Sequence, residues 1–221
     1  MPRRSPVRDR LLRAILGGAG QSRRGGDGTP PTLYALAKTT DIAFAWVHET
    51  VKELAMLGLL STDGGVRVVD APGTFRWWAD HRQRPTGPTF YVQDPVVMSE
   101  ELRSRGIDLA ATTYYAEIAY ARHLFPRRFD AYIEADQRIP ARNHIITLGG
   151  QLGGGNFRLL EADANLLREA GEWTSLLHRP SLRYTVAPLP QVIVDLMKEG
   201  ASAGEAADLL MEREYPAQAR V

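Results

Sequence analysis

The chain has 221 residues, of which 24% are charged, with no cysteine and a formal net charge of +1. This length suffices to bury a core without metal or disulfide help, and the absence of cysteine excludes a disulfide scaffold and a thiolate zinc site. No apolar run approaches the roughly 20 residues of a membrane span, and the arginine-rich start is unlike a signal peptide, so we expect a soluble cytoplasmic protein.

The small net charge hides an asymmetry between the two parts of the chain. Residues 1–85 hold 13 Lys/Arg against 8 Asp/Glu, whereas residues 86–221 hold 14 against 18. Seven arginines lie in the first 24 residues: Arg3, Arg4, Arg8, Arg10, Arg13, Arg23 and Arg24. Such a basic arm suits contacts to DNA phosphates, with a merely solvated tail as the alternative.

The first 56 residues predict three helices. Apolar residues at helical intervals predict a helix over residues 6–16, ended by Gly17 and Gly18, and a loop over residues 21–31. Two further helices follow at residues 33–38 and 42–54. In the last of these, one side forms an apolar stripe of Val47, Val51 and Leu54. The opposite side presents Ala45, His48, Glu49 and Lys52, with Trp46 at its shoulder.

Both ends of that third helix carry local signals. Thr39, Thr40 and Asp41 precede it and are expected to accept its first free N–H groups, and Gly58 is expected to reverse the chain after it. Two short strands, residues 59–61 and 66–69, flank an Asp-Gly turn and predict a β-hairpin, with Arg67 available to a phosphate.

The remainder predicts a second domain. Pro72 and Gly73 are expected to break the chain before a short helix at residues 74–82, whose Phe75, Trp77 and Trp78 read as core. A proline-containing linker places the boundary near residue 86, giving domains 1–85 and 86–221. Strands are predicted at residues 89–92, 130–134, 145–148, 157–161 and 182–187, and helices at 99–105, 109–124, 191–198 and 203–213. The expected class is α+β with a mostly antiparallel sheet.

Catalytic signals are weak. The glycine segment 149–155 lacks the Lys-Ser or Lys-Thr of a phosphate loop and reads as a hairpin connection. The acids that could gather metal ions are Asp130, Glu134, Asp136, Glu161 and Asp163. The five histidines, His48, His81, His123, His144 and His178, lie on separate elements, and Ser175 near His178 lacks an ordered acid partner. We therefore expect no catalytic residue, no metal and no cofactor.

Two sets of motifs resemble known proteins. Leu33-x-x-Leu-Ala-Lys, followed by Trp46-Val47-His48-Glu49 and Leu57-Gly58-Leu59, resembles the winged helix-turn-helix of bacterial and archaeal transcription regulators. More weakly, segments 110–116, 186–196 and 204–210 look similar to the AbiEi-like (type IV) antitoxin and transcriptional-regulator family. That resemblance implies a repressor of its own operon whose C-terminal domain opposes a toxin protein.

Together these observations predict a sequence-specific transcriptional repressor that binds double-stranded DNA, as a monomer or a homodimer. The residues expected at the DNA are Arg3, Arg4, Arg8, Arg23, Arg24, Thr40, Ala45, Trp46, His48, Glu49, Lys52 and Arg67. Two alternatives stay open: a protein-docking module that uses Ala45 and Trp46, and a metal-dependent enzyme acting on nucleic acid through its C-terminal acids.

Overall fold

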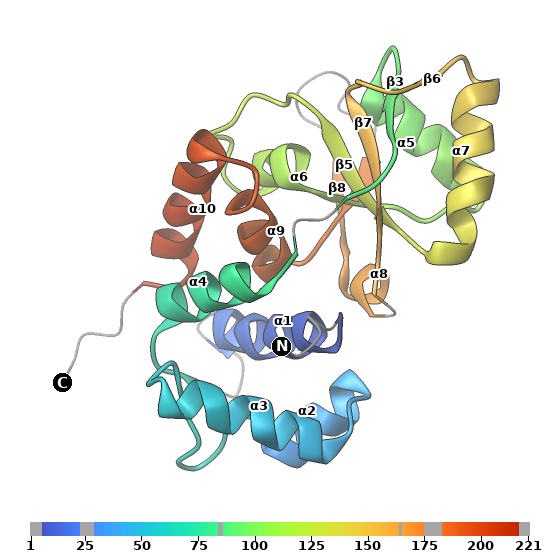
Figure 1. Ribbon diagram of the computed structural model, residues 1–221. Coiled ribbons are helices and arrows are strands. Elements are labelled where there is room, and N and C mark those ends of the chain that lie inside the picture. Colours follow the sequence, from blue (N-terminus) through green and yellow to red (C-terminus); the bar gives the residue numbers. More distant parts are fainter. Residues whose placement is uncertain (1–5, 23–28, 84–85, 164, 175–182, 217–221) are drawn as a thin grey trace. The chain divides into compact units, whose positions relative to one another are not determined.

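The computed structural model describes residues 6–22, 29–83, 86–163, 165–174 and 183–216 (Figure 1). The chain divides into two compact units. The first comprises Met1–Gln83 together with Ala207–Val221, and the second comprises Arg84–Ala206.

The first unit is mainly helical. Its elements are α1 (Pro6–Ser22), α2 (Leu33–Thr40), α3 (Phe44–Met56), β1 (Leu60–Ser61), β2 (Arg67–Val68) and α4 (Ala71–His81). Helix α1 packs against α2 and α4 and buries Leu12 and Leu16 completely. It also continues beyond Gly17 and Gly18, where we expected it to end. A helical glycine costs about 1 kcal/mol relative to alanine but does not by itself stop a helix.

The expected break at Pro72 and Gly73 is also wrong, because both residues lie in the first turn of α4. Proline fits there since the first helical N–H groups have no partner within the helix. The Asp70 carboxylate accepts the Gly73 N–H at 2.9 Å and so caps the helix.

The C-terminal residues of the chain belong to the first unit, although we expected them in the second domain. Tyr215 is 3% exposed, and its ring meets Phe75 edge to face at 5.1 Å. Its hydroxyl donates to the Leu16 carbonyl at 3.2 Å. This anchoring assigns Ala207–Val221 to the first unit, and the sequence boundary falls between Gln83 and Arg84.

The second unit combines helices with one seven-stranded sheet. Its strands are β3 (Thr89–Tyr91), β4 (Ala110–Thr112), β5 (Phe129–Ile133), β6 (Gln151–Leu152), β7 (Phe157–Glu161), β8 (Gly171–Thr174) and β9 (Arg183–Val186), in the order β6-β3-β7-β5-β4-β9-β8. Its helices are α5 (Pro95–Ser104), α6 (Thr113–Tyr120), a 3-10 turn at Ala135–Gln137, α7 (Arg138–Thr147), α8 (Leu166–Glu169), α9 (Leu189–Leu196) and the start of α10 (Ala201–Glu214).

The sheet is mixed, which revises the expected mostly antiparallel arrangement. Strand β5 runs parallel to β7 over five paired residues, and β4 runs parallel to β9. The pairs β3 with β6, β3 with β7, β4 with β5, and β8 with β9 are antiparallel. Helices α6 and α9 contact each other and β4. Helix α5 contacts α7 (Figure 1). All five residues of β5 are buried, as expected for a central strand covered on both faces.

Two predicted elements of this unit are wrong. The long helix expected at residues 109–124 begins only at Thr113, because Ala110–Thr112 forms a central strand between β5 and β9. Where a strand was expected at residues 145–148, residues 145–147 form the end of helix α7 and Leu148 follows it as the C-cap; the helix buries Ala141 and Ile145. In both places tertiary packing overrides local propensity.

Candidate nucleic-acid interface

Helix α3 follows a tight turn from α2. Asp41 takes a left-handed conformation (φ 52°), and its N–H bonds to carbonyls at the end of α2. The residue before α3 is Ala43, which makes no side-chain cap. The expected capping of α3 by Thr39, Thr40 and Asp41 is therefore wrong. Asp41 instead ends α2, a position that aspartate tolerates because its short polar side chain can satisfy nearby backbone groups.

Thr40 is the last residue of α2, and its side chain is buried. It is 2% exposed, and its hydroxyl donates to the Leu36 carbonyl at 2.6 Å. A bond from a threonine to the carbonyl four residues earlier is a common way to satisfy a hydroxyl within a helix. Thr40 is thus not exposed to a DNA ligand, contrary to its place among the expected contacts.

The two faces of α3 differ as the apolar stripe predicts. Val47, Thr50, Val51 and Leu54 are buried. The exposed side carries Ala45, His48, Glu49 and Lys52, which leaves those four predicted contacts accessible, and Trp46 is half-buried. Four residues before His48, the half-exposed Phe44 ring stacks on its imidazole with 6.3 Å between centroids.

The β1–β2 hairpin follows α3. Leu60 pairs with Val68, and Ser61 pairs with Arg67, whose side chain is exposed. The turn packs closely on the segment before α2: a Cβ added to Gly65 would lie 2.8 Å from the Pro30 carbonyl oxygen. Gly65 also has φ +120°, so both its backbone conformation and its surroundings require glycine.

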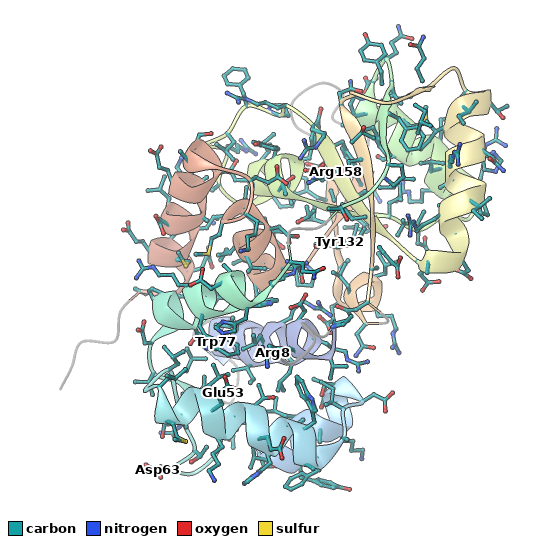
Figure 2. The ribbon with its side chains drawn as sticks, viewed as in Figure 1. Arg8, Glu53, Asp63, Trp77, Tyr132 and Arg158 are labelled. Carbon is teal, nitrogen blue, oxygen red and sulfur yellow. The ribbon has the colours of Figure 1, made fainter. Side chains whose placement is uncertain are left out.

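Two described arginines of α1, Arg8 and Arg10, contact other residues of the first unit. The Arg8 guanidinium lies over the Trp77 ring at 5.1 Å from its centroid (Figure 2). Arg10 donates to the Asp41 carbonyl at 3.2 Å, which ties α1 to the turn between α2 and α3. The remaining expected arm contacts, Arg3, Arg4, Arg23 and Arg24, lie outside the described residues.

Asp9 fixes α1 against α4, a role that the sequence did not suggest. Its carboxylate accepts the Trp78 indole N–H at 2.7 Å and the Arg82 Nε–H at 2.8 Å. Trp78 is fully buried, in agreement with the predicted core role of its ring. The single acid among the early arginines thus helps to build the helical scaffold behind α3.

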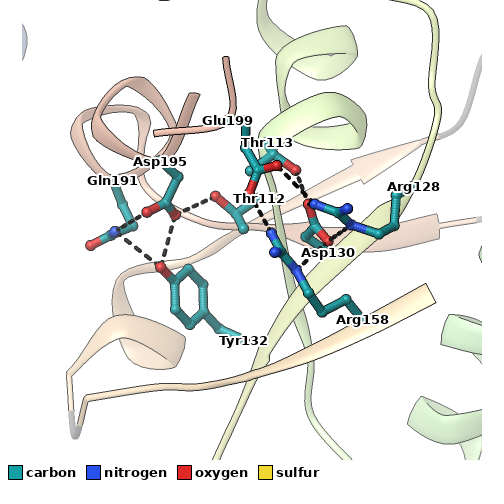
Figure 3. Close-up of polar contacts among 9 residues, drawn as sticks. All are labelled: Thr112, Thr113, Arg128, Asp130, Tyr132, Arg158, Gln191, Asp195 and Glu199. Atoms are coloured by element: carbon teal, nitrogen blue, oxygen red, sulfur yellow. Dashed lines mark hydrogen bonds and ion pairs between the residues drawn. The ribbon is translucent and has the colours of Figure 1, made fainter. Parts of the chain in front are cut away.

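The second unit contains a charged cluster, which we define as Arg128, Asp130, Arg158 and Glu199 (Figure 3). Arg128 is partly exposed, and the other three side chains are buried. Both arginines bridge both acids. Asp130 binds Arg128 Nε at 2.5 Å and Arg158 Nε at 2.8 Å, and Glu199 binds their Nη2 atoms at 2.9 and 2.7 Å. Burial by itself lowers the pKa of Arg128, but the hydrogen bonds and charges of Asp130 and Glu199 outweigh it and raise that pKa above its ordinary value.

Thr113 completes the surroundings of Asp130. Its hydroxyl donates to Asp130 Oδ2 at 2.5 Å, and its φ of 52° is a strained conformation for a β-branched residue. Both carboxylate oxygens of Asp130 are therefore occupied by donors. This arrangement does not suit the metal-binding role that we considered for Asp130.

A second polar group lies beside the charged cluster, around the buried Asp195. Its carboxylate accepts hydroxyl hydrogens from Thr112 at 2.6 Å and Tyr132 at 2.8 Å (Figure 3). Gln191 donates to its other oxygen at 3.1 Å. These hydrogen bonds join α9 to β4 and β5, because Asp195 and Gln191 lie on the helix and their two hydroxyl partners on the strands.

Within the described part of the chain, no three histidine, aspartate or glutamate side chains come together in a group that could bind a metal ion. Of the acids considered for catalysis, Glu161 pairs with Arg138 at 2.8 Å, and Glu134 and Asp136 are exposed. His178 and Ser175 lie outside the described residues. Among the described helices, none has both the length and the apolar character needed to cross a bilayer.

Comparison with known proteins gives no match to a family model, a curated protein or a solved structure.

Proposed function

We propose that the chain is a sequence-specific transcriptional repressor that binds duplex DNA through α3 and the β1–β2 hairpin. The observation that carries the proposal is the exposed face of α3, with Ala45, His48, Glu49 and Lys52 directed away from the buried stripe. An α-helix of this kind fits the major groove of B-DNA, where base edges differ in their donors and acceptors.

The chemistry of that face supports a particular division of roles. Lys52 is a donor for guanine or for a phosphate, and His48 adds a second polar group. Glu49 repels phosphate but accepts a hydrogen bond from the cytosine amino group. Arg67 on the hairpin would contact the adjacent backbone. With a carboxylate at the centre of the face, the helix itself contributes little nonspecific affinity, so the basic arm would supply most of it.

Fluorescence anisotropy with the duplex upstream of the protein's own gene tests this proposal. The titration is made at two salt concentrations, with random DNA as the comparison. We expect the affinity for DNA to fall steeply as the salt concentration rises. Lys52→Glu should weaken binding about 10-fold or more, because it removes a phosphate or base contact and adds a repelling charge. Arg142→Glu is the matched control. It reverses the charge of an exposed residue on α7 in the second unit and should leave DNA binding unchanged.

Two outcomes would refute the proposal: a purified protein that ignores every duplex at low ionic strength, or equal effects of the Lys52 and Arg142 reversals. Docking of a protein on Ala45 and Trp46 would then be the better interpretation. The antitoxin role and the toxin partner rest on the resemblance alone and stay predictions.

A further inference from the structure

The loop between α6 and β5 carries an apolar side chain that the fold does not use. Phe125 is 89% exposed, more than any other large apolar residue in the described part of the chain. Single exposed apolar residues are common on protein surfaces and by themselves indicate nothing. The loop around Phe125, however, is held by hydrogen bonds to a buried carboxylate and carries two exposed arginines.

The anchor is the buried Glu117 on α6, which is 0% exposed. Its two carboxylate oxygens accept the backbone N–H groups of His123 at 2.9 Å and Leu124 at 3.0 Å. On the other side of Phe125, Pro126 restricts the backbone of the residue before it. The side chain is thus presented by a preformed loop, and binding through such a loop loses little conformational entropy.

The charge of the loop has one sign. Arg122 and Arg127 are both exposed, and no acid lies between Glu117 and Asp130 in the sequence. Arg122 adopts a left-handed conformation (φ 62°), which is uncommon for a non-glycine residue. Cations thus flank the exposed ring on both sides along the chain.

We propose that the loop of residues 121–127 is a docking site for a protein partner whose surface offers an apolar pocket bordered by aspartate or glutamate. Aromatic residues and arginine are enriched at the energetic centres of protein interfaces, and complementary charges select the partner. Nucleic acid fits less well. Only Arg122 and Arg127 supply exposed permanent charges in the loop, and residues 86–221 hold 18 acids against 14 Lys/Arg.

A subtractive selection from phage-displayed random peptides tests this site. The immobilised full chain captures peptides, and those that also bind the Phe125→Ala variant are discarded. We expect the remaining peptides to combine an aromatic or aliphatic centre with an excess of aspartate and glutamate. Synthetic versions of these peptides should bind the unaltered chain about 30-fold more tightly than they bind the Phe125→Ala variant. A loss of affinity of this size is typical of a hot-spot residue.

Two further variants test the charge and the location. Arg127→Glu should weaken these peptides about 10-fold, and peptides with lysine in place of their acids should bind this variant better than the unaltered chain. Ile139→Ala removes another exposed apolar side chain, 72% exposed on α7, and should have no effect.

The proposal is wrong if no peptide depends on Phe125, or if the dependent peptides lack an acidic excess and ignore Arg127→Glu. Fluorescence anisotropy with duplex DNA distinguishes a protein partner from nucleic acid. A loss of DNA affinity in Phe125→Ala, with none in Ile139→Ala, would assign the loop to nucleic acid and overturn the assignment to a protein partner.

Discussion

Removal of one acid from the charged cluster should strongly destabilise the second unit. Asp130 is 0% exposed and accepts hydrogen bonds from Arg128, Arg158 and Thr113. In Asp130→Ala, the buried Arg158 guanidinium and the partly exposed Arg128 guanidinium would share only Glu199, so one positive charge would lose its compensation. Breaking a buried pair in this way costs about 3–5 kcal/mol, whereas removing both partners costs much less than the two single losses combined.

This magnitude is large relative to the total stability of a typical domain, which is about 5–15 kcal/mol. At roughly 4 °C per kcal/mol for a unit of this size, the transition of the second unit should fall by roughly 12–20 °C. The double variant Asp130→Ala with Arg158→Met should recover part of the loss, because it restores the balance of charge within the cluster.

Differential scanning calorimetry and urea unfolding followed by circular dichroism measure these changes. Asp136→Ala removes an exposed acid from the same unit and should change stability by less than about 0.5 kcal/mol. The reasoning fails if Asp130→Ala lowers the free energy of unfolding no more than this control does. It also fails if the loss in the double variant equals the sum of the losses in Asp130→Ala and Arg158→Met, because the cluster then does not act as a coupled unit.

Two more predictions concern a buried phenol and a turn glycine. The pKa of Tyr184 is raised mainly by burial and secondly by repulsion from the Tyr115 phenolate, so the folded state favours the neutral form of Tyr184. Stability should hold below pH 10 and decline above it, and Tyr184→Phe should lessen that decline by about 1.4 kcal/mol per pH unit in urea titrations at pH 9–12. An equally steep decline in both proteins would contradict this. In urea unfolding, Gly65→Ala should lower the free energy of unfolding by about 1–3 kcal/mol more than Gly64→Ala does. Both glycines have positive φ, but only a Cβ at Gly65 would collide with Pro30. Equal losses would mean that the turn can move to accommodate the Cβ.

The face of α3 could be predicted because it depends on one helix alone. A period of 3.6 residues assigns Val47, Val51 and Leu54 to one side and Lys52 to the other, whatever the rest of the chain does. The start of α3 was predicted wrongly since Asp41 suits two local roles. Aspartate favours both the cap before a helix and a left-handed residue after one, and the sequence does not distinguish them.

The strand β4 shows where local reasoning fails in the second unit. Ala110 and Ala111 have high helix propensity, and the aromatic residues after them continue a helical pattern. The structure nevertheless places them in a central strand, where their small side chains are 0% exposed. Thr113 then begins α6 in a strained conformation, and strain of this kind has no reliable sequence signal.

The charged cluster had a signal in the sequence, but one that depends on strand register. Phe129-Asp130 and Phe157-Arg158 each place one charge directly after a phenylalanine at the start of an apolar strand. In the parallel pairing of β5 with β7, Phe129 stacks on Phe157 at 5.3 Å, and the same register sets Asp130 beside Arg158. A shift by one residue would move every side chain of one strand to the opposite face and separate both pairs. The ion pair and the aromatic pair therefore select the same register, which explains how a buried charge can specify the fold even where an apolar pair would stabilise it equally well.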